Sequence, residues 1–131
     1  PHLSARRFAR RAYPVHAGTP LALALDGLTD AGARAMVVVD SDDEPVALAS
    51  EAAVAAVPIE RRPWVDVGAV SRRIASDMVL PVETAGDQLL GLMSTTDYDN
   101  YLVVDDQGRI FGVLAAEDVV AALKGKGLPK S

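Results

Sequence analysis

The sequence contains no cysteine, few aromatic residues and no long apolar run. With no cysteine among 131 residues, disulfide bonds and thiolate–metal sites are excluded. Aromatic residues make up only 5% of the chain, so the core must be built mainly from Val, Leu and Ala. No apolar stretch approaches the ~20 residues that a membrane-spanning helix needs, and no signal peptide is visible. These absences predict a soluble fragment.

Positive charge is scarce outside the first twelve residues. The formal net charge is −5 and the isoelectric point about 4.9, which argues against a nucleic-acid partner. Residues 1–12 hold four arginines and no acidic residue, so the remainder carries −9. Such a segment is typical of a juxtamembrane stretch that lies against anionic headgroups, or of a solvated linker helix whose Leu3 and Phe8 touch the domain. Because the chain begins at Pro1 and not at Met, we expect it to be part of a longer protein.

The stretch from Tyr101 to Leu123 predicts a strand, a tight turn, a second strand and a helix. Residues 101–104 and 110–114 are apolar runs, and residues 105–108 form a turn because Asp and Gly favour turn conformations. The following residues show helical spacing of apolar side chains. We expect the buried face of this helix to hold Val119, Val120 and Leu123.

A second copy of this unit lies upstream. Residues 36–39 and 46–49 predict strands around a turn at 40–43, and residues 50–57 predict a helix with Ser50 as its N-cap. A shift of 65 residues places the first copy on the second, with the turn aspartates and the core valines aligned. An internal repeat of this length predicts an α/β fold of two β-α-β-β-α repeats packed about a pseudo-two-fold axis.

An extended segment and a helix precede each copy. Residues 14–17 and 80–82 are the expected extended segments, and residues 65–70 lead into the second repeat. The helices are expected to start at Thr19, as an N-cap followed by proline, and at Thr84.

The repeat divides the chain into five expected segments. Trp64, the only tryptophan, is expected to pack against the core and fix the connection between the repeats. The segments are a basic linker or juxtamembrane segment at 1–12, a first repeat at 13–60, a linker at 61–64, a second repeat at 65–124 and a tail at 125–131.

Both copies resemble CBS domains. The first carries V-x-x-x-T-P-L-x-x-A-L, M-V-V-V-D and P-V-A-L-A-S-E-A-A-V, and the second carries Y-L-V-V-D-D-Q-G-R-I-F-G-V-L-A-A-E-D-V. Two CBS domains in tandem make a CBS pair, or Bateman module, and the resemblance covers roughly residues 13–124. It implies the α/β repeat fold and a homodimer that associates through its helices.

A narrower resemblance concerns the parent protein. The string V-A-L-A-S-E-A-A-V-A-A-V-P-x-E-R-R-P-W-V is similar to the C-terminal CBS region of actinobacterial site-2 protease-like proteins, which are membrane zinc metalloproteases of the M50 class. This resemblance implies a regulatory fragment on the cytoplasmic side of a membrane, with zinc bound only in the parent protease domain. The motif H-E-x-x-H is absent, since His2 and His16 have no Glu at the required spacing. We therefore expect no catalytic residue and no metal ligand in this chain.

The CBS resemblance also implies a ligand. CBS pairs commonly bind adenine nucleotides such as AMP or ATP in a cleft between the repeats, through a G-h-x-[S/T]-x-x-D pattern. A hydroxyl and helix N-terminal amides receive phosphate, and a carboxylate binds the two ribose hydroxyls. In the second repeat the pattern reads Gly112, Ala115 and Asp118, so the carboxylate is present and the hydroxyl is missing. Val103 or Tyr101 would flank the base.

The first repeat keeps the other half of the polar pair. Ser50 supplies the hydroxyl, but Ala47 and Ala53 replace the glycine and the aspartate. Two interpretations stay open. Either one residual nucleotide site is centred on Asp118, or Asp118 and Ser50 only stabilise the starts of their helices.

Three functions follow. The first is an allosteric regulator that senses a nucleotide. The second is a ligand-free module for dimerisation or protein–protein interaction, or one that regulates another parent protein. The third, a free-standing enzyme, is disfavoured because the chain lacks cysteine, a histidine-based dyad and a metal motif.

Overall fold

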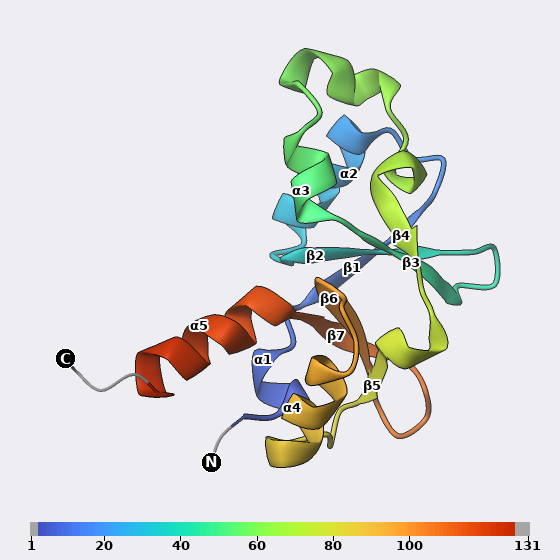
Figure 1. Cartoon of the computed structure of the whole chain (residues 1–131). Helices are drawn as coiled ribbons and strands as arrows, with labels where there is room; N and C mark the ends of the chain where they lie inside the picture. Colours follow the sequence, from blue (N-terminus) through green and yellow to red (C-terminus); the bar gives the residue numbers. More distant parts are fainter. Residues whose placement is uncertain (1–2, 128–131) are drawn as a thin grey trace. The chain divides into compact units, whose positions relative to one another are not determined.

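The computed structural model describes residues 3–127 and divides them into two compact units (Figure 1). The first unit consists of residues 10–76. The second unit consists of residues 77–127 together with residues 3–9 from the start of the chain. The opening segment of the chain is therefore built into the unit that follows last in sequence.

The first unit is a four-stranded sheet with helices in its connections. The sheet has the order β1-β2-β3-β4, in which β1 and β2 are parallel and the other neighbours are antiparallel. Its strands are β1 (Ala12–His16), β2 (Ala35–Val39), β3 (Pro45–Ala49) and β4 (Ser71–Arg73). Its helices are α2 (Leu21–Asp30), α3 (Glu51–Ala55) and the 3₁₀ helices η1 (Ile59–Trp64) and η2 (Val67–Val70). Because parallel neighbours require a crossover, α2 makes the connection from β1 to β2.

The second unit repeats this plan with a smaller sheet. Its strands are β5 (Val79–Pro81), β6 (Asn100–Val104) and β7 (Ile110–Ala115), with β5 parallel and β7 antiparallel to the central β6. The helices are α1 (Ala5–Phe8), α4 (Gly86–Ser94) and α5 (Ala116–Gly127), and the short η3 (Ser76–Met78) precedes β5. The predicted strand–turn–strand–helix order and the α/β fold are confirmed in both halves.

Each unit has one apolar core on one face of its sheet, built mainly from aliphatic side chains, as the scarcity of aromatic residues predicts. In the first unit the buried members are Val15, Leu21, Ala24, Met36, Val38, Val67 and Val70. In the second unit they are Ala5, Leu80, Val82, Leu89, Tyr101, Val103, Leu114 and Val119. Alternate residues of the strands, such as Val37 and Leu102, are also buried and lie on the opposite sheet face. Both faces of each sheet are therefore apolar.

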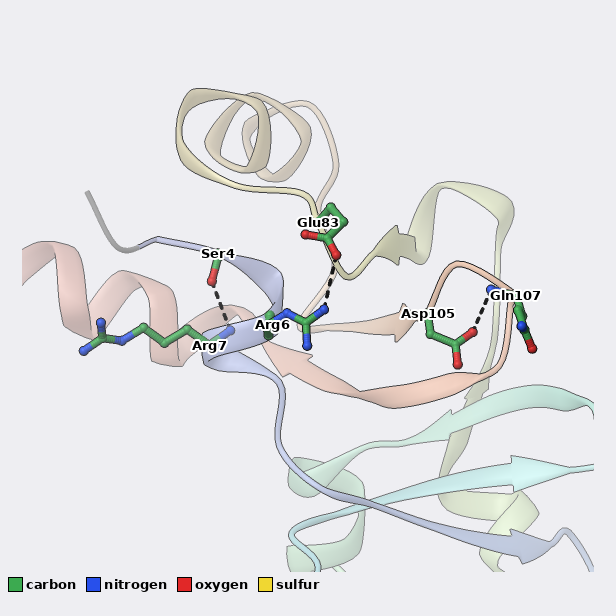
Figure 2. A network of polar contacts seen from close by, with 6 residues as sticks. All are labelled: Ser4, Arg6, Arg7, Glu83, Asp105 and Gln107. Atoms are coloured by element: carbon green, nitrogen blue, oxygen red, sulfur yellow. Dashed lines mark hydrogen bonds and ion pairs between the residues drawn. The ribbon is translucent and has the colours of Figure 1, made fainter.

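The two hairpin turns have the same side-chain hydrogen bonds at equivalent positions of the two repeats. Asp40 accepts the backbone N–H groups of Asp42 and Glu44 on Oδ1, at 2.8 and 3.0 Å. Asp105, 65 residues later, accepts those of Gln107 and Arg109 at 2.9 Å each, and Figure 2 shows the first of these. The N–H of Arg109 contributes most to holding the pKa of the Asp105 carboxyl below its usual value, because it stabilises the charged form.

The predicted helix starts at Thr19 and Thr84 are wrong. The N-cap of α2 is Pro20 and that of α4 is Ala85, and neither makes a side-chain cap. Thr84 is buried instead, and its carbonyl accepts a hydrogen bond from the opening segment of the chain. A local capping signal was overridden by a long-range backbone contact.

The prediction for Trp64 is also wrong, because its side chain is 84% exposed. The connection after α3 is fixed by Arg62, whose guanidinium donates to the carbonyls of Val57 (3.0 Å) and Val54 (3.4 Å). These bonds fix the connection to the end of α3, where the Val54 carbonyl also accepts the N–H of Val57 at 3.1 Å. With the connection held by Arg62, the tryptophan is free to face solvent.

The apolar face predicted for the last helix is only partly confirmed. Val119 is buried, whereas Val120 and Leu123 are 46% and 38% exposed. Of the three residues predicted to be buried on helix α5, only Val119 is therefore buried in the core of the second unit.

The compact units follow other boundaries than the sequence repeats. Residues 65–70, expected to lead into the second repeat, contain the 3₁₀ helix η2, and β4 then pairs with β3 of the first unit. With the shift of 65, residues 3–9 correspond to residues 68–74. Each of these equivalent segments belongs to the unit formed by the other repeat. The sequence pattern cannot show such an exchange, because it leaves the local spacing of apolar residues unchanged.

Candidate functional site

The strongest sequence candidates lie where β7 ends and α5 begins. Ala115 is the last residue of β7 and is buried, as is Gly112. No loop separates the strand from the helix, so Asp118 falls in the first turn of α5 and is half-buried. The N–H of Ala116 donates to the carbonyl of Asp99 at 2.8 Å and fixes the start of the helix. The structure thus brings Gly112, Ala115 and Asp118 to one strand–helix junction.

This junction has the chemistry to bind a polyhydroxylated anion. A carboxylate in the first turn of a helix accepts hydrogen bonds from vicinal hydroxyls, and the N–H groups of a helix N-terminus attract phosphate. Ala115 occupies the position before the helix where a hydroxyl would add a third polar contact. The junction therefore presents a carboxylate and helix amides but lacks the hydroxyl.

Tyr101 and Val103 have a different environment from the one that the sequence suggested. Both side chains point into the core of the second unit and are no more than 1% exposed. The Tyr101 hydroxyl is paired with Thr96 Oγ1 at 2.5 Å, and the ring packs edge-on against Tyr98 with centroids 5.8 Å apart. To contact a base, the side chains of Tyr101 and Val103 would have to leave the core, so their geometry favours a structural role.

Ser50 acts as the N-cap of α3 in the first unit. Its Oγ accepts the N–H of Ala53 at 3.1 Å, as predicted for an N-cap. The next residue, Glu51, forms an ion pair with Arg10 at 3.1 Å, and Arg10 itself is only 9% exposed. Ser50 and Asp118 belong to different units, so each unit retains one half of the polar pair.

Sequence reasoning missed the polar contacts of the opening segment. Arg6 forms an ion pair with Glu83 at 3.2 Å, and its guanidinium lies 5.2 Å from the centroid of the Phe111 ring (Figure 2 shows the ion pair). Its partners are 77 and 105 residues away along the chain. No local spacing signal could have found them.

Metal binding and membrane crossing gain no support from residues 3–127. Within that range no cluster of three or more His, Asp or Glu side chains is arranged to hold a metal ion. Across the same residues, none of the helices has the length and apolar character needed to cross a membrane.

Comparison with known proteins identifies the architecture. Residues 67–125, which include Gly112, Ala115 and Asp118, match the family model of the CBS domain. The CBS-pair protein CBSX2 from Arabidopsis thaliana is 22% identical over 97% of this chain and 99% of that one, with a TM-score of 0.61. The chain has the fold of a CBS-domain pair. Comparison with curated proteins gave no match.

Two further CBS structures contain ligands. The CBS domain pair of protein MJ0100, in complex with methylthioadenosine and S-adenosyl-L-methionine, is 17% identical over 96% of this chain and 99% of that one, with a TM-score of 0.66. The cytosolic domain of the Mg²⁺ channel MgtE, in complex with ATP, is 21% identical over 92% of this chain and 47% of that one, with a TM-score of 0.60. At these identities the likeness establishes the CBS-pair fold of this chain.

Proposed function

We propose that this chain is a regulatory CBS-pair module that binds an adenosine-containing ligand such as AMP or ATP. The observation that carries the proposal is Asp118, placed in the first turn of α5 directly after β7. Solved CBS structures of the same fold contain ATP, S-adenosyl-L-methionine and methylthioadenosine. These ligands share an adenosyl group, and Asp118 is the carboxylate that would bind the hydroxyls of its ribose.

Regulation requires that the ligand favour one state of the module over another. A ligand that bound two states equally would shift nothing. Contacts to Asp118 and to the first-turn amides of α5 would be made only when β7 and α5 have the arrangement seen here. The ligand would therefore stabilise this arrangement of the second unit.

Calorimetric titration with AMP, ATP and S-adenosylmethionine tests the ligand proposal. Asp118→Ala is expected to weaken binding about 10- to 100-fold, the loss expected for hydrogen bonds to a charged group. Ala115→Ser is expected to strengthen binding about 2- to 10-fold, because it restores a hydroxyl before the helix.

The matched control is Asp87→Ala. Asp87 is an exposed aspartate in the first turn of α4 in the same unit, so its removal makes the same change in charge in the first turn of another helix. We expect it to bind each ligand as the wild type does. If the folded wild type gives no heat with any of the three compounds, the ligand proposal is wrong.

A second candidate function is self-association without a ligand, and exposed apolar side chains favour it. In the first unit Leu23, Ile59 and Trp64 are 63%, 76% and 84% exposed, on α2 and η1. Large exposed apolar groups, tryptophan above all, are characteristic of protein interfaces.

Light scattering tests this candidate. We expect the wild-type chain to have the mass of a homodimer and Trp64→Glu to shift it towards the monomer. Val120→Glu, the same kind of change at an exposed apolar residue of the second unit, should leave the mass unchanged. A strict monomer at high micromolar concentration would exclude self-association.

We further propose that the parent protein is a site-2 protease-like zinc metallopeptidase of the membrane, with this module on the cytoplasmic side. The sequence resemblance supports this proposal, as do the exposed Arg6, Arg7 and Arg11 near the start of the chain. Arg10 does not contribute to such a basic surface because it is buried and paired with Glu51. Reading the gene upstream of Pro1 for H-E-x-x-H and membrane helices tests the proposal, and their absence there would remove it.

A further inference from the structure

Residues 3–9, here called the N-terminal strap, are held by backbone hydrogen bonds to the second unit. The Ala5 N–H donates to the Thr84 carbonyl at 2.8 Å, and the Gly86 N–H donates to the Leu3 carbonyl at 2.7 Å. Ser4 and Ala85 form an antiparallel bridge between these bonds. The strap is therefore paired with the connection between β5 and α4.

The strap also completes the core of the second unit. Ala5 is fully buried in the cluster that contains Leu114 and Val119, and Leu3 and Phe8 pack against it. Leu114 directly precedes Ala115, and Val119 directly follows Asp118. The residues that flank the proposed ligand contacts and the residue that anchors the strap thus belong to one packed cluster.

Arg6 adds a third attachment, to two different elements. It forms an ion pair with Glu83, which follows β5, and its guanidinium lies over the ring of Phe111 on β7 (Figure 2 shows the ion pair). Both partners of the ion pair are more than half exposed, so this contact contributes little on its own. The strap is held by the buried Ala5, by Leu3 and Phe8 packed against the same core and by two backbone bonds, an attachment small enough to open locally.

We propose that docking of the N-terminal strap is coupled to ligand binding at Asp118. The inference rests on the proposed function and adds the segment that would transmit the effect of ligand binding. Ligand contacts at the start of α5 hold Leu114 and Val119 in the positions that receive Ala5, so the ligand favours the docked strap. Because coupling between two binding equilibria is reciprocal, the docked strap strengthens ligand binding by the same factor.

Amide hydrogen exchange on the full chain, measured by NMR with and without saturating AMP, ATP or S-adenosylmethionine, tests the first half of the coupling. We expect a bound ligand to slow the exchange of the Ala5 and Gly86 amides by at least about fivefold. These two amides make the bonds between the strap and the second unit, so they report docking directly.

Variants of the strap test the reciprocal half by calorimetry. Ala5→Asp places a carboxylate in the core and should release the strap, which weakens ligand binding about fivefold or more. Arg6→Glu is a milder variant that places a second carboxylate beside Glu83. It should also weaken ligand binding. Arg7→Glu makes the same charge change at the neighbouring exposed position and should bind as the wild type does.

The outcomes separate the coupling from the ligand proposal. Slower exchange at Ala5 and Gly86, with weaker binding only in the Ala5 and Arg6 variants, supports the coupling. Normal ligand binding with unchanged exchange, or equal affinities for Arg6→Glu and Arg7→Glu, overturns the coupling and leaves the ligand proposal intact. No heat with any of the three compounds overturns both.

Discussion

Replacing Tyr101 with alanine should lower the free energy of unfolding by about 3–5 kcal/mol, the range for removing a large aromatic side chain from a core. Tyr101 is 1% exposed and is the largest fully buried side chain of the chain's described residues. Its ring packs against the same cluster as Leu114 and Val103, and its hydroxyl is paired with Thr96. The loss therefore combines a cavity with one lost hydrogen bond, while the Thr96 hydroxyl still donates to the Leu92 carbonyl at 2.9 Å. Urea unfolding followed by circular dichroism measures the change.

Two controls identify the origin of this effect. Tyr101→Phe keeps the ring and removes only the hydroxyl, so it should cost about 1 kcal/mol. Trp64→Ala removes a larger aromatic group that is 84% exposed and should change stability by no more than about 0.5 kcal/mol. If Tyr101→Ala were tolerated but abolished nucleotide binding, the tyrosine would be a ligand contact, as the sequence pattern suggested, and its structural assignment would be wrong.

Gly27→Ala and Gly91→Ala should change stability in opposite directions. Both glycines lie inside helices, α2 and α4, where alanine is intrinsically better by about 1 kcal/mol. At Gly27 an added Cβ would lie 2.1 Å from the Tyr13 hydroxyl oxygen and 2.6 Å from the ring carbon that bears it. No atom lies within 4 Å of the corresponding Cβ at Gly91.

The clash at Gly27 should outweigh the helical gain. A ring cannot bend away as a flexible chain end can, so Tyr13 must move out of its packing beside the first-unit core, at a cost typical of overpacking of about 1–3 kcal/mol. We therefore expect Gly27→Ala to lower the urea midpoint and Gly91→Ala to raise it. The double variant Gly27→Ala with Tyr13→Phe should recover part of the loss, because the nearest clashing atom is then absent. A raised midpoint for Gly27→Ala alone would contradict this packing argument.

The features that could be predicted from sequence are those specified by neighbouring residues. The turns at Asp40 and Asp105 depend on a carboxylate and the N–H groups two and four residues later, so the sequence pattern contains all of the partners. Ser50 caps α3 through an amide three residues away, which is equally local. The placement of Asp118 in the first turn of α5 followed from the same short-range reasoning.

The incorrect predictions share a different origin. The roles of Thr84 and Trp64 were predicted from local signals. The Thr84 carbonyl, however, accepts the N–H of Ala5, almost eighty residues earlier in the chain. The role expected of Trp64 is filled by Arg62. The expectation that Val103 or Tyr101 flanks a bound base stays a prediction. Which of the two sheet faces receives the core decides their environment, and both faces of this sheet are apolar.

Local chemistry in the chain was therefore sufficient for the repeat, its turns, its strands and the position of Asp118, the carboxylate proposed to bind ribose. A period of 65 residues with matched turns can be recognised from the sequence because each turn interaction spans at most a few residues. The three-dimensional fold was needed to show that the opening segments are exchanged between the units, and that Ala5 and Arg6 attach the N-terminal strap beside β7. The physical reason is that the partners of this segment, such as Thr84 and Leu114, lie far away along the chain. Long-range packing, and not local propensity, therefore selects the unit that the segment joins.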